Sequence, residues 1–399
     1  MQYFFVFLFC GVLLYFPILS AGFAGDDYSQ LVHQPLLHNA QNSLTVLDKV
    51  LVFPNGHTIL FGYFYRPLPF LLYTLGYAAG NGNPFVLHLI QLLLYLGATT
   101  CLFLFYKTFF SQKLAFLLAS IFLIHPANNE LVAYIAALPD TLCLFFGLLA
   151  LFIVSITKQP TFLKKLLVSI FLLFALFAKE TGMLFVVLVG LYALYKKCAK
   201  QYIFPLFISI GVYLACRIHA SYHPLLTILP SPALDYAIAR RIMFSLQIAS
   251  AFLREIIVPT RTALKPHAFE PTIAAILLAL AILFLFSACC VILWLWIKNY
   301  HSKNMTLFLF FLSWVGVGIL FFVQIIPLEM IFAQRWLYLA EIGLLGIFGT
   351  VVASLAPLPK SPLITICTIL FGFLLLSYTI ETIILTTMWT HWQNYFNLK

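Results

Sequence analysis

Two neighbouring carboxylates, Asp26 and Asp27, follow the first apolar run of this 399-residue chain. Adjacent carboxylates repel each other, so one of them holds its proton more tightly unless a cation neutralises the pair. Such a carboxylate can act as a general base on a hydroxyl group. The pair equally suits a helix N-cap, because Asp accepts hydrogen bonds from the first N–H groups of a helix. We therefore expect either a catalytic base or a cap at Asp26 and Asp27, and these two residues would hold Mg²⁺ or Mn²⁺ if the protein uses a metal ion.

Two more acids, Glu130 and Asp140, lie between long apolar stretches. An acid at membrane depth costs a few kcal/mol unless it is paired, so its presence indicates a functional role. His125 precedes Pro126 at the end of an apolar run, where a lone His is more often a helix-end hydrogen bonder than a catalyst. The sequence therefore marks the acids of this segment more strongly than its histidine.

The segment Ala178-Lys179-Glu180-Thr181-Gly182 brings two opposite charges together between apolar runs. A buried ion pair of this kind often serves structure alone. We expect Lys179 and Glu180 to pair with each other and fix the register of the neighbouring helices.

All seven arginines lie in loops or at helix ends on one side of the predicted membrane. They are Arg66, Arg217, Arg240, Arg241, Arg254, Arg261 and Arg335. The planar guanidinium fork binds phosphate or carboxylate through two parallel hydrogen bonds. A site for a phosphorylated ligand is our preferred interpretation of the set. Salt bridges among the outer loops are the alternative, and for Arg335 so is an aromatic belt with a snorkelling arginine.

The composition requires lipid as the main solvent of the chain. Apolar residues make up 63% of the sequence and charged residues 9%, with a mean hydropathy of +1.03. A soluble domain carries about 25% charged residues. Runs of about 20 apolar residues cross a bilayer core of about 30 Å, and the chain holds about eleven such candidates. These runs lie near 3–20, 84–106, 114–126, 139–157, 166–178, 183–195, 202–219, 273–297, 305–324, 337–356 and 362–388. The stretches 68–79 and 241–258 suit interfacial or re-entrant helices better.

Lysines define the predicted topology. Five connections, at 107–113, 158–165, 196–200, 298–303 and 357–361, contain eleven lysines, no arginine and no acid. Such enrichment is typical of the cytoplasmic side. With the N-terminus inside, eleven of the twelve acids fall on the opposite side, Glu381 being the exception. We expect the first apolar run to be a retained helix, because the basic segment of a secretory signal is absent.

Several classes of function lack support in the sequence. No nucleotide-cradling glycine motif is present, and the lysines and arginines are scattered, which argues against a nucleic-acid partner. The eight cysteines show no metal-binding spacing, and we expect no disulfides. The chain shows no internal repeat, which argues against a transporter or lipid flippase, although that class stays an alternative.

The order of motifs resembles a known family. The motifs are Asp26-Asp27, Tyr65-Arg66-Pro67-Leu68, His88 within Phe85–Ile90, His125-Pro126 with Glu130, Ala178–Gly182, and Ala333-Gln334-Arg335-Trp336-Leu337-Tyr338-Leu339. Together they resemble the membrane domain of the transmembrane and tetratricopeptide-repeat O-mannosyltransferases and their bacterial relatives. These belong to the GT-C superfamily of glycosyltransferases, which use polyprenyl-phosphate sugars. The resemblance runs from about residue 20 to the C-terminus.

The resemblance implies an all-α, polytopic GT-C-like membrane domain over residues 1–399, with outer loops at about 21–83 and 217–271. It implies Asp26 or Asp27 as the base, and Glu130 as the acid of a His-Pro-x-x-x-Glu motif. By the same resemblance, Arg66 and Arg335 bind the lipid phosphate or orient the acids. We expect further substrate contacts from His125, Asp140, Lys179, Glu180, Arg254 and Arg261.

The implied activity is transfer of a sugar, with mannose favoured, from a polyprenyl-phosphate donor to a hydroxyl of an acceptor protein or glycan. The reaction would take place on the periplasmic or lumenal face of a bacterial inner membrane or the endoplasmic reticulum. An oligosaccharide ligase or polymerase, and an inactive scaffold, are the alternatives.

The chain departs from the family pattern at two places. Ala137-Leu138-Pro139 stands before Asp140, where family members have Gly-Arg. The sequence also reaches Trp389 and Trp392 about where tetratricopeptide repeats would begin, and shows none. We therefore expect acceptor recognition to differ from the family or to be supplied by another chain.

Overall fold

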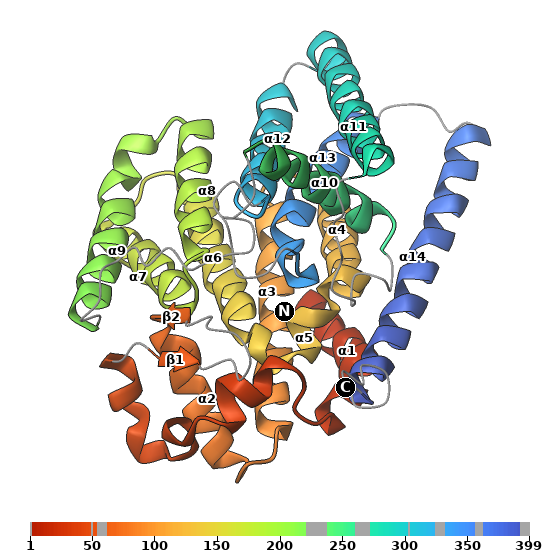
Figure 1. Ribbon diagram of the computed structural model, residues 1–399. Helices are drawn as coiled ribbons and strands as arrows, with labels where there is room; N and C mark the ends of the chain where they lie inside the picture. The colour runs from red at the N-terminus through yellow and green to blue at the C-terminus, as the bar shows by residue number, and fades with distance from the viewer. Residues whose placement is uncertain are drawn as a thin grey trace. The chain divides into compact units, whose positions relative to one another are not determined.

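The computed structural model describes residues 2–48, 51–53, 62–220, 238–259, 272–301, 304–323, 332–355 and 362–391, which are mostly helical (Figure 1). The strands within these ranges form one antiparallel hairpin, in which β1 (Leu51–Phe53) pairs with β2 (Gly62–Phe64). The predicted helical class is therefore confirmed, with this hairpin as an addition inside the segment predicted as the first outer loop.

The chain divides into two compact units, and the first holds residues 1–109, 129–229 and 380–399. Its amino-terminal part contains α1 (Gln2–Tyr15), a 3-10 turn η1 (Phe16–Ser20), α2 (Pro67–Ala79) and α3 (Phe85–Tyr106). The part after residue 129 contains α5 (Asn129–Ala133), η7 (Ile135–Ala137), α6 (Leu138–Ile156), α7 (Phe162–Ala178), α8 (Gly182–Tyr195) and α9 (Ala199–Ala220). The assignment of residues 1–399 to one GT-C-like domain stays a prediction.

Helix α6 is the centre of the first unit. It packs against α3, α7 and α8, while α7 also lies beside α9 (Figure 1). A Cβ atom added at Gly147 of α6 would lie 2.2 Å from the ring of Phe185 in α8, so only glycine allows this close approach. Small residues at such contacts are typical of helices that pack within a membrane.

The second unit holds residues 110–128 and 230–379. Its elements are α4 (Gln112–Ile124), η6 (Pro126–Asn128), α10 (Ile238–Ile257), α11 (Ile273–Tyr300), α12 (Met305–Leu320), η10 (Gln334–Trp336), α13 (Tyr338–Leu355) and the first part of α14 (Pro362–Thr390). Helices α12 and α13 contact through glycines. A Cβ atom at Gly318 would lie 2.6 Å from the backbone nitrogen of Ala340, and one at Gly346 would lie 2.2 Å from the ring of Phe311.

Six described helices are long and apolar enough to cross a membrane, or up to seven if the bent pair Gln112–Ile124 and Pro126–Ala133 is one span. The six are Phe85–Tyr106, Ile135–Ile156, Ala199–Ala220, Ile273–Tyr300, Tyr338–Leu355 and Ile369–Thr390. The eleven predicted runs are largely helical, but the prediction of about eleven spans is not confirmed. The reason is length: α8 has 14 residues, which reach only about 21 Å at 1.5 Å per residue, against a core of about 30 Å.

Helix ends place the charged side chains of the first unit. Helix α2 begins at Pro67, which suits a first turn because its nitrogen needs no partner there, and Arg66 is the residue just before it. Asp140 lies in the first turn of α6, where the helix dipole favours a negative charge. Between α7 and α8, a Cβ atom at Gly182 would meet the backbone of Ala175 at 2.5 Å, so glycine permits the sharp turn that carries Lys179 and Glu180.

Candidate active site

The turn that carries the two adjacent acids depends on Gly25. Its φ is +48°, in the left-handed region that favours glycine. A Cβ atom there would lie only 2.9 Å from the hydroxyl oxygen of Tyr134. Gly25 therefore lets the chain after η1 turn tightly against the segment that follows α5.

Asp26 and Asp27 occupy different environments. Asp27 is 1% exposed, and its two carboxylate oxygens accept N–H hydrogen bonds from Ala24 at 2.8 Å and Ala136 at 2.6 Å. The backbone N–H of Asp26 donates to the Tyr134 hydroxyl at 2.6 Å, while its side chain is half-buried. Asp27 thus anchors the turn, and Asp26 is the acid whose side chain is accessible to a substrate.

The segment that receives this turn is held from two helices. Gln91 of α3 donates from its side-chain amide to the carbonyl oxygens of Leu131 at 2.9 Å and Tyr134 at 2.6 Å. Tyr73 of α2 donates its hydroxyl hydrogen to the carbonyl of Ile135 at 2.9 Å. Neither Gln91 nor Tyr73 stands in a motif that would mark it from sequence, because each acts on backbone atoms remote in the chain.

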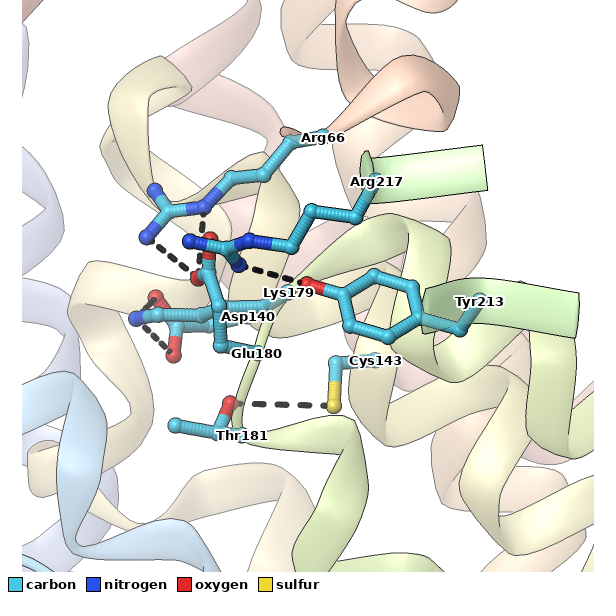
Figure 2. Close-up of polar contacts among 8 residues, drawn as sticks. All are labelled: Arg66, Asp140, Cys143, Lys179, Glu180, Thr181, Tyr213 and Arg217. Carbon is cyan, nitrogen blue, oxygen red and sulfur yellow. Dashed lines mark hydrogen bonds and ion pairs between the residues drawn. The ribbon is translucent and has the colours of Figure 1, made fainter. Parts of the chain in front are cut away.

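A second group of charged side chains forms where four segments of the first unit meet (Figure 2). Arg66 donates from Nε and Nη2 to one oxygen of Glu180, at 3.0 and 2.8 Å. The Nζ atom of Lys179 lies 2.7 Å from each carboxylate oxygen of Asp140. The structure therefore brings together four residues that the sequence predicted as substrate contacts.

The expected pairing of Lys179 with Glu180 is wrong. Lys179 is the C-cap of α7 and has an extended backbone, with φ −159° and ψ 150°. Successive side chains of an extended chain point to opposite sides. The two neighbours therefore take different partners, Lys179 with Asp140 and Glu180 with Arg66.

Arg217 in the last turn of α9 completes the group. Its Nη1 donates to the hydroxyl of Tyr213, one turn earlier, at 2.8 Å and lies 3.7 Å from Oε1 of Glu180 (Figure 2). The sequence included Arg217 in the set of seven arginines interpreted as a phosphate site but did not single it out. Its signal is an arginine in the last turn of an apolar helix, four residues after a tyrosine.

The charges in this group leave one positive charge in excess. Arg66, Lys179 and Arg217 stand against Asp140 and Glu180, and the side chain of Arg217 is 21% exposed. Burial alone would raise the pKa of Glu180, but the charge and hydrogen bonds of Arg66, aided by Arg217, bring that pKa below its ordinary value. A partly buried group with an excess cation suits an anionic ligand such as a phosphate.

Two elements, the segment Ile135–Ala137 and helix α2, position both the acid pair and the charged group at Arg66. The segment Ile135–Ala137, which holds Asp27, runs directly into α6, whose first turn carries Asp140. Helix α2, which supports that segment through Tyr73, directly follows Arg66. A displacement of either element would therefore affect the acid pair and the charged group together.

Other predicted residues lie elsewhere. His125, in the second unit, accepts at Nδ1 from the N–H of Ala127 at 3.2 Å, so its Nε2 donates to the carbonyl of Ile256 at 2.8 Å. Both ring nitrogens are thus engaged with backbone, which favours a structural role. Glu130 is buried in α5 of the first unit.

The outer arginines of the second unit are spread over several segments. Arg254 in α10 has a side chain that is 46% exposed and donates to the buried carboxylate of Glu255 at 2.9 Å. Arg335 lies in η10, next to Trp336, whose ring stacks on Phe322 at 5.0 Å. Arg261 falls outside the described residues. Substrate contacts by these arginines stay predictions.

The acid pair does not supply a set of metal ligands. Both oxygens of Asp27 accept backbone N–H groups. Over the ranges that the structure describes, no group of three or more His, Cys, Asp or Glu side chains is placed to hold a metal ion. The geometry at Asp26 and Asp27 therefore fits an anchored base better than a centre for Mg²⁺ or Mn²⁺.

The comparison with known proteins found a partial similarity to one curated protein. The chain is similar to Protein O-mannosyl-transferase Tmtc1 of Drosophila melanogaster, with 30% identity over 186 residues. This match covers 45% of the chain and 21% of Tmtc1, so the chain spans about a fifth of the length of that relative. No protein-family model and no solved structure matches the chain.

Proposed function

We propose that this protein is a membrane glycosyltransferase that moves a sugar, with mannose favoured, from a polyprenyl-phosphate donor to an acceptor hydroxyl. The observation that carries the proposal is the similarity to an O-mannosyltransferase. An accessible acid on an anchored turn and a cation-rich group, positioned by the same two elements, support it. The lysines of the five inner connections favour a site on the non-cytoplasmic side.

Asp26 is the proposed general base. Its side chain is half-buried, whereas the carboxylate of Asp27 is committed to two backbone N–H groups. The hydrogen bond from the Asp26 N–H to Tyr134 fixes the backbone at the base. A base held in this way needs little rearrangement when the hydroxyl arrives, which favours proton transfer.

Arg217 and Lys179 are the proposed contacts for the donor phosphate. Arg66 holds Glu180 through two short hydrogen bonds, whereas the 3.7 Å pair between Arg217 and Glu180 is loose. Arg217 can therefore turn its fork toward a phosphate while Glu180 stays paired. The excess positive charge would stabilise the negative charge that develops on the leaving phosphate.

The reaction follows from these roles. Asp26 takes the proton of the acceptor hydroxyl as its oxygen bonds to the anomeric carbon of the sugar. The bond from that carbon to the phosphate oxygen breaks, and its electron pair leaves with the polyprenyl phosphate. Attack from the face opposite the phosphate inverts the anomeric configuration, and no redox partner is needed.

The test is a donor panel with the purified protein in proteoliposomes. Radiolabelled polyprenyl-phosphate-mannose, polyprenyl-phosphate-glucose and a polyprenyl-diphosphate oligosaccharide are each offered with peptide and glycan acceptors. We expect label on an acceptor from the mannose donor and an inverted anomeric linkage. Transfer from the diphosphate donor alone would instead support an oligosaccharide ligase, and no transfer from any donor would contradict the proposal.

A further inference from the structure

Trp389 lies near the end of α14, on a helix face that packs inside the first unit. Residues 380–390 of α14 belong to that unit. In these turns the buried side chains fall at positions i, i+3, i+4 and i+7, which share one face of a helix. They are Thr382, Leu385, Thr386 and Trp389, each at most 3% exposed. A tryptophan at the end of a membrane helix often faces the lipid headgroups, whereas Trp389 is buried within the protein.

Two contacts join this face of α14 to the segment that begins with α5. The side-chain amide of Asn129, the first residue of α5, donates to the hydroxyl of Thr386 at 2.9 Å and to the carbonyl of Thr382 at 3.3 Å. Five residues later, the ring of Tyr134 lies against that of Trp389, with centroids 5.1 Å apart and an interplanar angle of 32°. Aromatic pairs attract each other over this range of separations. Helix α14 is thus held at a polar contact and at a ring contact.

The ring contact acts on the part of Tyr134 that its backbone contacts leave free to rotate. The carbonyl of Tyr134 is fixed by the amide of Gln91 at 2.6 Å, and the next carbonyl by the hydroxyl of Tyr73. These bonds hold the backbone, but they do not set the side-chain torsions of Tyr134. The hydroxyl is the atom of that side chain farthest from the backbone, so a rotation of the side chain displaces it most. A ring packed against Trp389 restricts that rotation.

The position of the Tyr134 hydroxyl matters because it accepts the 2.6 Å hydrogen bond from the N–H of Asp26. The same oxygen would lie 2.9 Å from a Cβ atom at Gly25, so the turn before the proposed base fits closely around it. Hydrogen bonds weaken steeply when distance and angle depart from their optimum. A displaced hydroxyl would therefore loosen the backbone that carries the Asp26 carboxylate.

From these contacts we propose that Trp389 is a positioning residue of the transfer reaction, whose ring holds Tyr134 in the orientation that fixes Asp26. This inference rests on the proposed function, in which Asp26 is the general base. Trp389 acts through Tyr134, and its effect on the reaction requires the Tyr134 hydroxyl. A ring that only fills space would change the amount of folded protein. A positioning ring also changes the turnover of the folded protein, because small displacements of a base slow the proton transfer.

The experiment is a double-mutant cycle on transfer from labelled polyprenyl-phosphate-mannose by the full chain in proteoliposomes, with rates expressed per folded molecule. Trp389→Leu replaces the ring by an aliphatic side chain, Trp389→Phe keeps a ring, and each is made in the wild type and in Tyr134→Phe. Thr386→Val removes the acceptor of the Asn129 amide and disturbs the same helix contact at a lower cost to folding. Trp314→Leu is the matched control, because Trp314 is fully buried in α12 of the second unit.

We expect Trp389→Leu to lower kcat about three- to tenfold, with the KM of donor and acceptor unchanged within about twofold. Trp389→Phe should stay closer to the wild type, and Thr386→Val should show a smaller fall in kcat. In the Tyr134→Phe background, which lacks the hydroxyl, Trp389→Leu and Thr386→Val should have little further effect, because residues that act on one contact are not additive.

Three results would overturn the inference. The first is a wild-type kcat in Trp389→Leu, or in Thr386→Val if Trp389→Leu does not fold. The second is an equal fall in kcat whether or not the Tyr134 hydroxyl is present, and the third is the same fall per folded molecule in Trp314→Leu. Absence of any transfer by the wild type would instead contradict the proposed function.

Discussion

The carboxylate of Asp27 accepts a 2.6 Å hydrogen bond from the backbone N–H of Ala136, a residue 109 positions further along the chain. This contact ties the turn that follows η1 to the segment that leads into α6. It also separates the roles of the two adjacent acids. A buried carboxylate that accepts two backbone N–H groups is a strong structural element, and its neighbour Asp26 is left as the accessible acid.

Asp27→Asn should destabilise the protein. The substitution places an amide NH₂ or a weaker acceptor opposite the N–H groups of Ala24 and Ala136, one of which loses its partner. We expect a loss of about 2–3 kcal/mol in the free energy of unfolding, measured by thermal unfolding in detergent. Asp26→Asn is the control and should unfold at the wild-type temperature. An Asp27→Asn protein as stable as the wild type would contradict the anchoring role.

Tyr134→Phe should slow turnover without preventing folding. The substitution removes the hydroxyl that accepts the 2.6 Å hydrogen bond from the Asp26 N–H, so the proposed base is less well held. Loss of one such bond is worth about 1–2 kcal/mol, which corresponds to a fall of roughly 5- to 30-fold in kcat. Steady-state kinetics at saturating substrates would measure it.

Tyr300→Phe is the matched control for this substitution, because Tyr300 is 73% exposed at the end of α11. A kcat equal to that of the wild type in Tyr134→Phe, with Tyr300→Phe also unchanged, would remove Tyr134 from the machinery that positions Asp26.

Glu180 should make stability depend on pH in the acid range. Its pKa in the folded protein lies below the ordinary value of 4.5, because the attraction of Arg66 and Arg217 exceeds the effect of burial. Its contribution to stability is therefore fully present above the pKa of the unfolded chain and is lost as pH falls through the folded pKa. Thermal unfolding of the wild type and Glu180→Gln, followed from pH 7 downward, would measure this.

The two proteins should differ most at neutral pH and converge as pH falls through the folded pKa of Glu180, which lies below 4.5. Arg66→Gln should lose as much stability at neutral pH as Glu180→Gln, because it removes the arginine that lowers the pKa of Glu180. A stability gap between wild type and Glu180→Gln that stays constant with pH would show that the ion pair with Arg66 does not stabilise the fold.

Arg217→Ala should weaken donor binding. The guanidinium of Arg217 supplies the cation that Glu180 binds only loosely, at 3.7 Å. We expect the donor KM to rise at least about tenfold, because a charge-assisted, two-point contact is lost. Arg217→Lys keeps the charge but loses the two-point guanidinium contact. Its donor KM should therefore lie between those of the wild type and Arg217→Ala. Tyr213→Phe, which removes the hydroxyl that Arg217 bonds, should have a smaller effect in the same direction. A donor KM unchanged in Arg217→Ala would contradict the phosphate contact.

The sequence predicted the local features of this protein better than its long-range contacts. Apolar runs located the helices, because period and length are properties of neighbouring residues. The segment Ala178–Gly182 was recognised as a charged turn, yet the partners of Lys179 and Glu180 lie 39 and 114 residues away and depend on how α6 and α2 pack. Sequence spacing alone favours the nearest opposite charge, which the extended backbone at Lys179 excludes.

The candidate site, like the ion pairs, depends on long-range contacts that the sequence did not predict. The two acids of Asp26-Asp27 look equivalent in sequence, and only the hydrogen bond to Ala136 separates them. The predicted number of spans is not confirmed for a related reason: hydropathy marks an apolar helix, but helices of 14 to 17 residues such as α8 and α7 are short for a bilayer core of about 30 Å. Arg217 was visible as an outer arginine, but its role depends on the approach of α9 to the turn between α7 and α8.

The most direct measurement is the rate of mannose transfer from labelled polyprenyl-phosphate-mannose by wild type and by Asp26→Asn in matched proteoliposomes. Loss of a positioned base should lower kcat about 10²- to 10⁴-fold, while the folded fraction and donor binding stay near those of the wild type. Wild-type activity that Asp26→Asn retains in full would contradict the central claim, because the hydroxyl would then be activated by another group.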